Sequence, residues 1–517
     1  MKQDWKQKLS RLRPLEWMII GLVFLGAVLR LWNMSNALQF LGDQGRDALV
    51  VSRIFKEQDI VLIGPVTSTG NMHLGPLYYY FMLPFLMLSY PSPLGPAYAV
   101  ALLSIATIVL MYWLGKEMVG EKAAALATFF FTFSATLIAY SRFSWNPNPS
   151  PLFGLLFIWS LYKTEQKKYW YWVGVAASIA VLIQLHYVTL LTLPVAGLFW
   201  LLQVKGWTKI AKKLRPQFIR ATLGSIALFI AFLSPLIVFD MRHDWLNVRS
   251  LQKFAGTSQE SVDSMPLVQK LGTTLAETHG RSLQLFFELS IGKKALFELY
   301  SEDLQRGINT VLLLAVLGTF GFLLSKKDNP HRTAHKILAV TYLISVIGLA
   351  FYRSSVFDHY VIFFLPVTFL IFGSVLSELT RWKAGWPIVA TVLVLYLGFN
   401  LPRIPLQTLG WTIQDMNATA QTIAERVSPG EKYNIVLLSE TKDIYGENYR
   451  YFLSTTQTPP LRIEHFGEVE TLFIIDEQKL EKDVTSLPIY EIVVFPNKEP
   501  VEVYSIPDGP RITVLRK

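Results

Sequence analysis

The sequence predicts a mostly helical, polytopic membrane protein that ends in a small soluble α/β domain. Of its 517 residues, 52% are hydrophobic and only 17% are charged, a balance that is rare in water-soluble folds of this length. Long apolar segments alternate with short basic ones up to about residue 400, after which short β-rich runs replace them. The chain has no cysteine, which excludes disulfides, thiolate metal sites and thiol nucleophiles.

The first apolar segment is predicted to be a retained membrane helix. Residues 1–13 are basic, and residues 15–32 are long enough to cross a bilayer and lack a small-residue cleavage pattern. Apolar segments of roughly spanning length lie at residues 15–33, 97–114, 123–140, 151–162, 170–188, 189–204, 218–238, 308–325, 337–352, 359–378 and 386–400. We therefore expect about eleven crossings.

The segment 77–90 is apolar and aromatic, but Pro76, Pro84 and Pro91 bracket and interrupt it. We place it at the membrane interface, where tyrosine is favoured. Without a crossing there, one side of the membrane receives the basic segments at 2–13, 116–122, 163–168, 205–220, 326–336 and 381–383. The positive-inside rule makes that side cytoplasmic. We expect a cytoplasmic N-terminus and an outer C-terminal part, in the plasma membrane.

This assignment of sides divides the chain into two parts. Residues 1–400 form the membrane domain, with a first outer loop at 34–76, a long outer loop at 240–307 and short outer turns at 142–150 and 353–359. Residues 401–517 form the soluble extracytoplasmic domain, whose predicted strands lie at 434–439, 472–476, 490–495, 501–505 and 512–515. The net charge of +10 does not indicate nucleic acid, because the basic residues lie in short segments between membrane helices.

The first outer loop carries the main candidate for chemistry. Asp43, Arg46 and Asp47 lie within five residues, about one turn if the segment is helical. A carboxylate there can accept a proton or hold a metal, and the planar guanidinium of arginine suits phosphate. The competing interpretation is a solvated loop in which Asp43 caps a helix and forms a local ion pair.

Other polar residues lie at the predicted outer ends of the apolar segments. They are His73, Tyr78, Arg142, Asn146, His186, Tyr187, Arg242, His243 and His359. Polar groups at such depth usually face a cavity or the bundle interior. The competing interpretations are an interfacial anchor for each tyrosine and a hydrogen-bonded packing group for a lone histidine. Together, these outer elements predict one shared polar bowl, with Arg46 and all of these residues, including Tyr78 and Tyr187, as candidates for binding the substrate or its phosphate.

Four features together resemble glycosyltransferase family 39 in its broad sense. They are the acidic motif after the first helix, the run from Pro76 to Tyr80, the turn bearing Arg142, and the soluble outer tail. That group includes protein O-mannosyltransferases and the lipid A aminoarabinose transferase, and has the GT-C fold. The resemblance implies transfer of a sugar, with inversion, from a polyprenyl-phosphate donor to a glycan, lipid or protein acceptor on the outer face.

The resemblance also implies roles for individual residues. Asp43 matches the catalytic base or acceptor-orienting residue, whereas Gln44 replaces the family's neighbouring glutamate, which makes Asp47 the candidate second carboxylate. His73 stands where relatives often have a lysine, so His73 or Arg46 takes over the phosphate contact. Asn146 stands in a turn where relatives often have an aspartate. A divalent metal is therefore not expected to be essential.

Two other functions fit part of this pattern. An O-antigen-type ligase or polymerase also joins lipid-linked sugars on the outer face, but uses a pyrophosphate-linked oligosaccharide. A transporter or lipid flippase would place ionisable groups near the bilayer midplane, with broken helices there. The ionisable groups of this chain gather at one face, which favours an enzyme.

Overall fold

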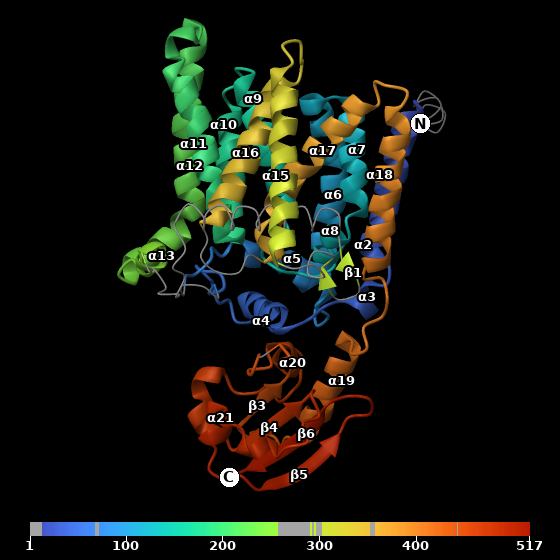
Figure 1. The fold of residues 1–517 in the computed structure, drawn as a ribbon. Coiled ribbons are helices and arrows are strands. Elements are labelled where there is room, and N and C mark those ends of the chain that lie inside the picture. The colour runs from blue at the N-terminus through green and yellow to red at the C-terminus, as the bar shows by residue number, and fades with distance from the viewer. Residues whose placement is uncertain are drawn as a thin grey trace, which may run out of the picture.

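The computed structural model describes residues 13–67, 72–256, 290–291, 294–295, 302–351, 357–441 and 443–517. A helical bundle stands above a small α/β domain, and the start of the first described helix and the C-terminus lie at opposite ends of the molecule (Figure 1). The bundle helices are α2 (Pro14–Leu31), α6 (Leu94–Val119), α7 (Glu121–Phe133), α8 (Ala135–Tyr140), α9 (Ser150–Glu165), α10 (Tyr171–Leu185), α11 (Thr192–Lys205), α12 (Arg215–Arg242), α15 (Glu302–Ser325), α16 (Arg332–Ala350), α17 (Leu365–Leu379) and α18 (Gly385–Asn400).

Within the described ranges, eight helical segments are long and apolar enough to cross a membrane. They are Pro14–Leu31, Leu94–Val119, Tyr187–Lys205, Lys212–Arg242, Gly307–Ser325, Arg332–Ala350, Ile362–Leu379 and Gly385–Arg403. The other three predicted crossings coincide with shorter helices: α7 with α8, α9, and α10. The prediction of a multi-pass integral membrane protein is confirmed, and the number of eleven crossings stays a prediction.

Small residues let the central helices approach closely. A Cβ on Gly154 of α9 would lie 1.9 Å from the Phe363 carbonyl oxygen, and one on Gly373 of α17 would lie 2.3 Å from the Ala123 carbonyl oxygen. Without a strong hydrophobic drive between helices in lipid, such backbone proximity is what holds a membrane bundle together. The glycines therefore allow α9, α17 and α7 to form the buried centre of the bundle.

The backbone groups freed at the break between α7 and α8 are hydrogen-bonded by side chains from other helices. Arg30 of α2, which is fully buried, donates to the Phe131 and Thr132 carbonyls, each at 3.1 Å. The Asn400 side chain accepts from the Ala135 N–H at 2.8 Å. Backbone groups in a bilayer need partners within the protein. The broken helix is thus a packed element whose freed backbone groups are bonded to the protein.

Three short helices cover the lower end of the bundle: α3 (Met34–Ala37), α4 (Gly42–Lys56) and α5 (Leu77–Ser89). The ribbon in Figure 1 shows α4 lying between the bundle and the C-terminal domain, with α5 just above it. In the predicted outer loop 240–307, α13 (Leu246–Gly256) and the two-residue strands β1 (Ser290–Ile291) and β2 (Lys294–Ala295) are described. Most of that loop, and residues 353–356 of the predicted turn 353–359, lie outside the described residues.

The C-terminal domain is built on a four-stranded sheet in the order β3-β4-β6-β5. Its elements are α19 (Ile413–Ala424), β3 (Tyr433–Leu438), α20 (Glu447–Leu453), β4 (Thr471–Asp476), α21 (Tyr490–Val493), β5 (Pro500–Ser505) and β6 (Arg511–Arg516). Strands β3 and β4 run parallel, with Tyr433 opposite Thr471, whereas β6 pairs antiparallel with both β4 and β5. This sheet confirms the predicted fold class.

One predicted strand is wrong, because residues 490–493 form helix α21. Ile492 and Phe495 are buried in one hydrophobic cluster with Val436 and Ile474 of the sheet, while Val493 is exposed. Burial at a spacing of three residues is typical of a helix, whereas a half-buried strand alternates every two. Packing against the sheet has therefore overridden the β propensity of this segment.

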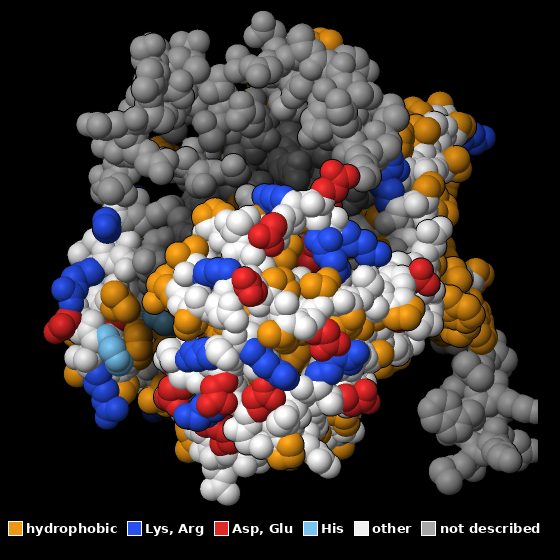
Figure 2. All heavy atoms as spheres, turned by 90° about the horizontal axis from the view of Figure 1, so that it is seen from below, with side chains coloured by type: hydrophobic (Ala, Val, Ile, Leu, Met, Phe, Trp, Pro, Cys, Tyr) orange, Lys and Arg blue, Asp and Glu red, His pale blue; other side chains and the backbone are white. Residues whose placement is uncertain are grey.

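The surface of the C-terminal domain is that of a soluble domain. Seen from below, positive and negative side chains are interspersed over it, whereas the part of the bundle to its right in the view is largely hydrophobic (Figure 2). Lys432 pairs with Glu468 at 2.7 Å, and Arg426 pairs with Glu502 at 3.2 Å. Interspersed charges of both signs favour solubility, so this domain is suited to the aqueous side of the bundle.

Candidate functional site

Helix α4 carries the predicted acidic motif on its first two turns. Leu41 is the N-cap residue of this helix, and its backbone N–H donates to the side-chain oxygen of Gln44 at 2.8 Å. The Asp43 carboxylate accepts a hydrogen bond from Arg46. Asp43 therefore does not act as the helix cap, and that part of the competing interpretation is wrong, whereas the local ion pair that it included is present.

Arg46 holds both carboxylates. Its Nη1 lies 2.7 Å from Asp43 Oδ1, and its Nη2 lies 2.8 Å from Asp47 Oδ1. The Nε–H also donates to Asp47 Oδ1, at 3.0 Å. The Asp43 side chain is 47% exposed and that of Asp47 is fully buried. The Arg46 guanidinium thus links the exposed Asp43 carboxylate to the buried Asp47 carboxylate.

The two carboxylates have different surroundings. Burial raises the pKa of Asp47 to about 6, although the nearby charge of Arg46 opposes this. The Tyr79 hydroxyl donates to Asp47 Oδ1 at 3.3 Å, and Asp47 Oδ2 has no hydrogen-bond partner in the described part of the chain. A carboxyl with a pKa near neutrality can gain or lose a proton at physiological pH. Sequence reasoning missed Tyr79, and its signal was the tyrosine run 78–80.

Arg142 is placed differently from the expectation of an outward-facing phosphate ligand. Arg142 is only 2% exposed. Its Nη1 donates to the Leu29 carbonyl at 3.0 Å, and its Nη2 donates to the Trp32 carbonyl at 2.8 Å. These carbonyls belong to the C-terminal end of α2, where a cation is favourable. Phosphate binding by Arg142 stays a prediction, and it would require these two bonds to open.

The turn after Arg142 is buried and polar. Asn146 is 2% exposed, and neither its amide nitrogen nor its amide oxygen has a hydrogen-bond partner among the described residues. The Tyr78 hydroxyl bonds the Ser144 hydroxyl at 2.7 Å, which joins α5 to this turn. A buried amide without partners costs about 1–3 kcal/mol. The binding role expected of Asn146 stays a prediction.

Two predicted histidines meet at the lower ends of α10 and α17. The ring centroids of His186 and His359 lie 5.1 Å apart. The Trp145 ring lies 4.7 Å from the His359 ring, and the Tyr360 ring lies 4.9 Å from the His186 ring. His186 Nδ1 accepts from the Val188 N–H at 3.2 Å, so the neutral ring carries its proton on Nε2. Trp145 and Tyr360 were not among the predicted site residues.

A third group surrounds His73 at the end of α12. The His73 N–H donates to the Asn247 side chain at 2.7 Å, and the Tyr187 hydroxyl donates to the His73 carbonyl at 2.5 Å. The His73 ring lies 5.0 Å from the Phe239 ring, on which His243 stacks at 4.1 Å. Arg242, in the last turn of α12, is exposed.

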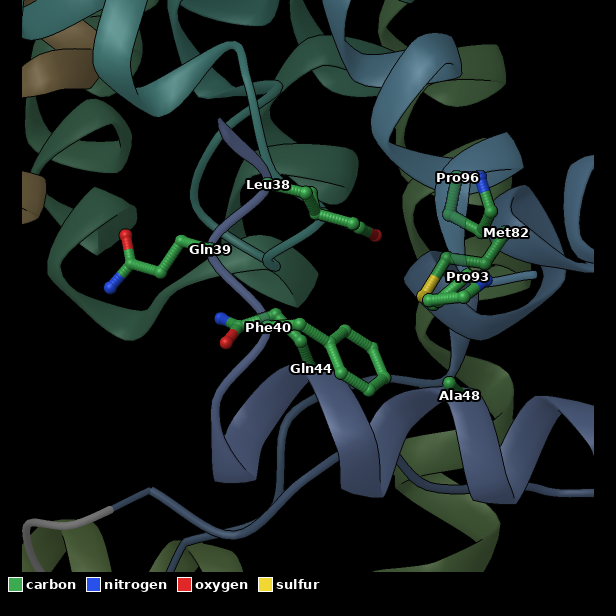
Figure 3. A pocket seen from close by; sticks show the side chains of 9 residues that line it. Leu38, Gln39, Phe40, Gln44, Ala48, Met82, Pro93 and Pro96 are labelled. Atoms are coloured by element: carbon green, nitrogen blue, oxygen red, sulfur yellow. The ribbon is translucent and has the colours of Figure 1, made fainter. Parts of the chain in front are cut away.

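Most of the predicted residues therefore fall into three groups at one end of the bundle, around α4, around His186 and around His73. Arg142 and Asn146 belong to the turn between α8 and α9, to which Tyr78 is bonded through Ser144. A small apolar cavity lies on the bundle side of α4 (Figure 3). It is lined by Leu38, Gln39, Phe40, Gln44, Ala48, Met82, Pro93, Pro96 and Ser144. Asp43, Arg46 and Asp47 are not among its lining residues. Within the described ranges, no group of three or more His, Asp or Glu side chains is arranged to hold a metal ion.

Comparison with known proteins agrees with this architecture. The family model for dolichyl-phosphate-mannose-protein mannosyltransferase matches residues 73–239. The crystal structure of ArnT from Cupriavidus metallidurans, bound to undecaprenyl phosphate, is similar with a TM-score of 0.50 at 13% identity, over 97% of this chain and 98% of that one. No curated protein matches the sequence.

Two further structures are more distant. The Archaeoglobus fulgidus oligosaccharyltransferase matches with a TM-score of 0.49 at 11% identity, over 90% of this chain and 70% of that one. Arabinofuranosyltransferase AftD from Mycobacteria matches with a TM-score of 0.45 at 13% identity, over 96% of this chain and 41% of that one. The match to ArnT shows the GT-C fold. With the family-model match, it confirms the resemblance drawn from the sequence.

Proposed function

We propose that this protein is a membrane glycosyltransferase that moves a sugar, with inversion, from a polyprenyl-phosphate donor to an acceptor hydroxyl. The reaction takes place at the end of the bundle that carries α4. The observation that carries the proposal is the group of Asp43, Arg46 and Asp47, which places two carboxylates and a guanidinium at the boundary between the bundle and a soluble domain. A polyprenyl phosphate is confined to the bilayer, so its sugar can be reached only at such a boundary.

In the proposed step, the acceptor oxygen attacks the anomeric carbon from the face opposite the phosphate. A bond forms between the anomeric carbon C1 and the acceptor oxygen while the bond between C1 and the phosphate oxygen breaks. The electrons of the broken bond leave with the phosphate oxygen. Asp43 takes the acceptor proton, since its half-exposed carboxylate can meet a hydroxyl from the aqueous side. A positioned base typically contributes about 10²–10⁴-fold.

Arg46 has two tasks in this proposal. Three of its five N–H groups already serve the carboxylates. The remaining two can donate to the leaving phosphate, whose negative charge grows as the bond breaks. Asp47 stays ionised above its raised pKa and keeps the guanidinium in place. His73, His186, His359 and Arg242 are the further candidates for the phosphate and the sugar.

The C-terminal domain lies at the same end of the bundle as α4 (Figure 1). In our proposal this end faces the extracytoplasmic side, and the N-terminus lies in the cytoplasm. The basic connections at 116–122, 163–168 and 326–336 support this orientation. The plasma membrane is the proposed location, and the acceptor is a glycan, lipid or protein on its outer face.

A panel of lipid-linked donors tests the proposal against its two rivals. Purified protein is incubated with polyprenyl-monophosphate monosaccharides, and release of polyprenyl phosphate is measured with and without candidate acceptors. We expect acceptor-dependent release from one monophosphate donor. Release only from a pyrophosphate-linked oligosaccharide would favour the ligase or polymerase. Movement of the intact lipid across a vesicle membrane, without cleavage, would favour the flippase.

A further inference from the structure

We propose that α20 of the C-terminal domain is a positioning element that holds α4, and with it Asp43, Arg46 and Asp47, against the bundle. The inference rests on the proposed function of these three residues. It assigns the soluble domain a part in catalysis, with Gly45 as the residue that permits the contact.

The two helices approach each other to backbone distance at Gly45. A Cβ at this position would lie 2.4 Å from the Asn448 nitrogen and 2.5 Å from the Glu447 carbonyl oxygen. Real Cβ atoms do not approach other atoms so closely, and backbone atoms cannot rotate away as a flexible side chain can. A side chain at position 45 would therefore push α20 off α4.

Helix α20 is itself fixed within its domain. The Asp443 carboxylate accepts from the Tyr445 and Glu447 backbone N–H groups at 3.2 and 3.1 Å, which secures the start of the helix. The buried Arg450 donates to the Tyr445 and Leu461 carbonyls at 3.0 and 2.9 Å. Because these bonds tie α20 to the loops around it, a contact on α20 is a contact with the whole domain.

Further contacts fix the domain around both ends of α4. Before α4, the Phe40 ring lies 5.6 Å from the rings of both Tyr451 and Phe452. Directly after its last residue, Glu57 pairs with Arg462 at 2.6 Å. One hydrophobic cluster runs without interruption from α4 and α5 into α20 and the sheet. The domain is thus docked along the full length of α4.

The docked face lies opposite the carboxylates. With 3.6 residues per turn, Asp43 and Asp47 share one side of α4, and Gly45 lies roughly 200° around the helix from Asp43. The bundle holds the carboxylate side, through Tyr79 at Asp47, while α20 holds the glycine side. Displacing α20 removes one of the two supports of α4, and a misplacement of about 1 Å can cost roughly 10²-fold in rate.

The test compares Gly45→Ala with Gly21→Ala in the full-length protein. Gly21 also lies in a helix, but a Cβ there meets nothing within 4 Å. Alanine favours a helix over glycine by about 1 kcal/mol, so a loss in Gly45→Ala reflects the lost contact. We expect kcat for sugar transfer to fall at least about 10-fold in Gly45→Ala, with a donor KM within about threefold, since burial of the long lipid chain would supply most of the binding free energy of the donor. Gly21→Ala should change neither. An unchanged kcat in Gly45→Ala would overturn the proposal.

A cross-link measures docking without any activity. The chain has no cysteine, so Gly42→Cys with Asp443→Cys creates a single pair, at positions where a Cβ on residue 42 would lie 3.1 Å from the Asp443 Cβ. Disulfides span roughly 3.5–4.5 Å between Cβ atoms, which needs little adjustment. We expect rapid oxidation of this pair and at least fivefold slower oxidation when Gly45→Ala is added. Equal oxidation rates would show that α20 stays docked and would refute the mechanism.

The cross-linked enzyme separates a static support from a moving lid. Oxidised Gly42→Cys with Asp443→Cys should keep the kcat of its reduced form, because α20 stays docked during turnover. Loss of turnover on oxidation and recovery on reduction would refute static positioning. If the unaltered protein transfers no sugar from any donor although the pair still oxidises rapidly, then the proposed function has failed, and the positioning role fails with it.

Discussion

Replacing Asp43 by asparagine separates a catalytic carboxylate from a structural one. The Asp43 side chain is 47% exposed and forms one ion pair with Arg46 at 2.7 Å. An exposed pair of this kind contributes about 0.2–1 kcal/mol to stability. The helix start does not depend on Asp43, since Gln44 bonds the Leu41 N–H. Asp43→Asn should therefore lower the free energy of unfolding by less than about 1 kcal/mol.

The effect on the rate should be much larger. Loss of a general base costs about 10²-fold or more, which corresponds to roughly 2.7 kcal/mol in the activation barrier. The assay is transfer from the donor that the panel identifies, with kcat and donor KM determined together with thermal unfolding in detergent. Donor KM should change little, because the substitution leaves the guanidinium of Arg46 in place on Asp47.

Two variants complete this experiment. Asp59→Asn, at an exposed position after the end of α4, is the matched control and should keep full activity. Asp47→Asn should reduce both stability and rate, because it leaves Arg46 without its buried partner. If Asp43→Asn keeps most of its turnover while Asp47→Asn loses it, then Asp47 is the base and our assignment is wrong.

Four further outcomes are expected. The fold raises the pKa of Asp47 from 3.8 to about 6, so the folded chain holds this proton more tightly than the unfolded chain. The free energy of unfolding should therefore fall by roughly 3 kcal/mol as pH rises from about 4 to about 6. Measuring the free energy of unfolding across this pH range for the protein and for Asp47→Asn checks this, and the same pH dependence in both would contradict it. Arg142→Ala should lower the free energy of unfolding by about 2–4 kcal/mol through its bonds to α2; weaker donor binding at normal stability would instead identify a phosphate ligand. A cysteine at Thr455 should react with an impermeant thiol reagent on intact cells and one at Thr208 should not, whereas the reverse would invert the topology. Activity should survive chelation, and loss that one added metal restores would show a required ion.

Composition and hydropathy determined most of the membrane architecture, because a bilayer imposes a length and an apolarity that are visible in any sequence. The segment 77–90 shows how charge adds to this. Its prolines and the basic connections placed it at the interface, and α5 lies at the end of the bundle beside α4. The ion pair of Asp43 with Arg46 was also within reach of sequence reasoning, since residues three apart are neighbours on a helix. The pair of Arg46 with Asp47 joins adjacent residues, which that spacing rule does not predict.

Long-range contacts decided the rest. The sequence predicts Arg142 as a phosphate ligand, and this stays a prediction. It gives no sign that Arg142 bonds carbonyls at the end of α2, more than a hundred residues earlier in the chain. Residues 490–493 have strand propensity and form a helix, since Ile492 and Phe495 pack on the sheet. Gly45 reads as an ordinary helix glycine until α20, about four hundred residues later, lies against it. Local spacing and solvent preference are properties of the sequence, whereas the partner that a side chain meets is set only when distant segments are brought together.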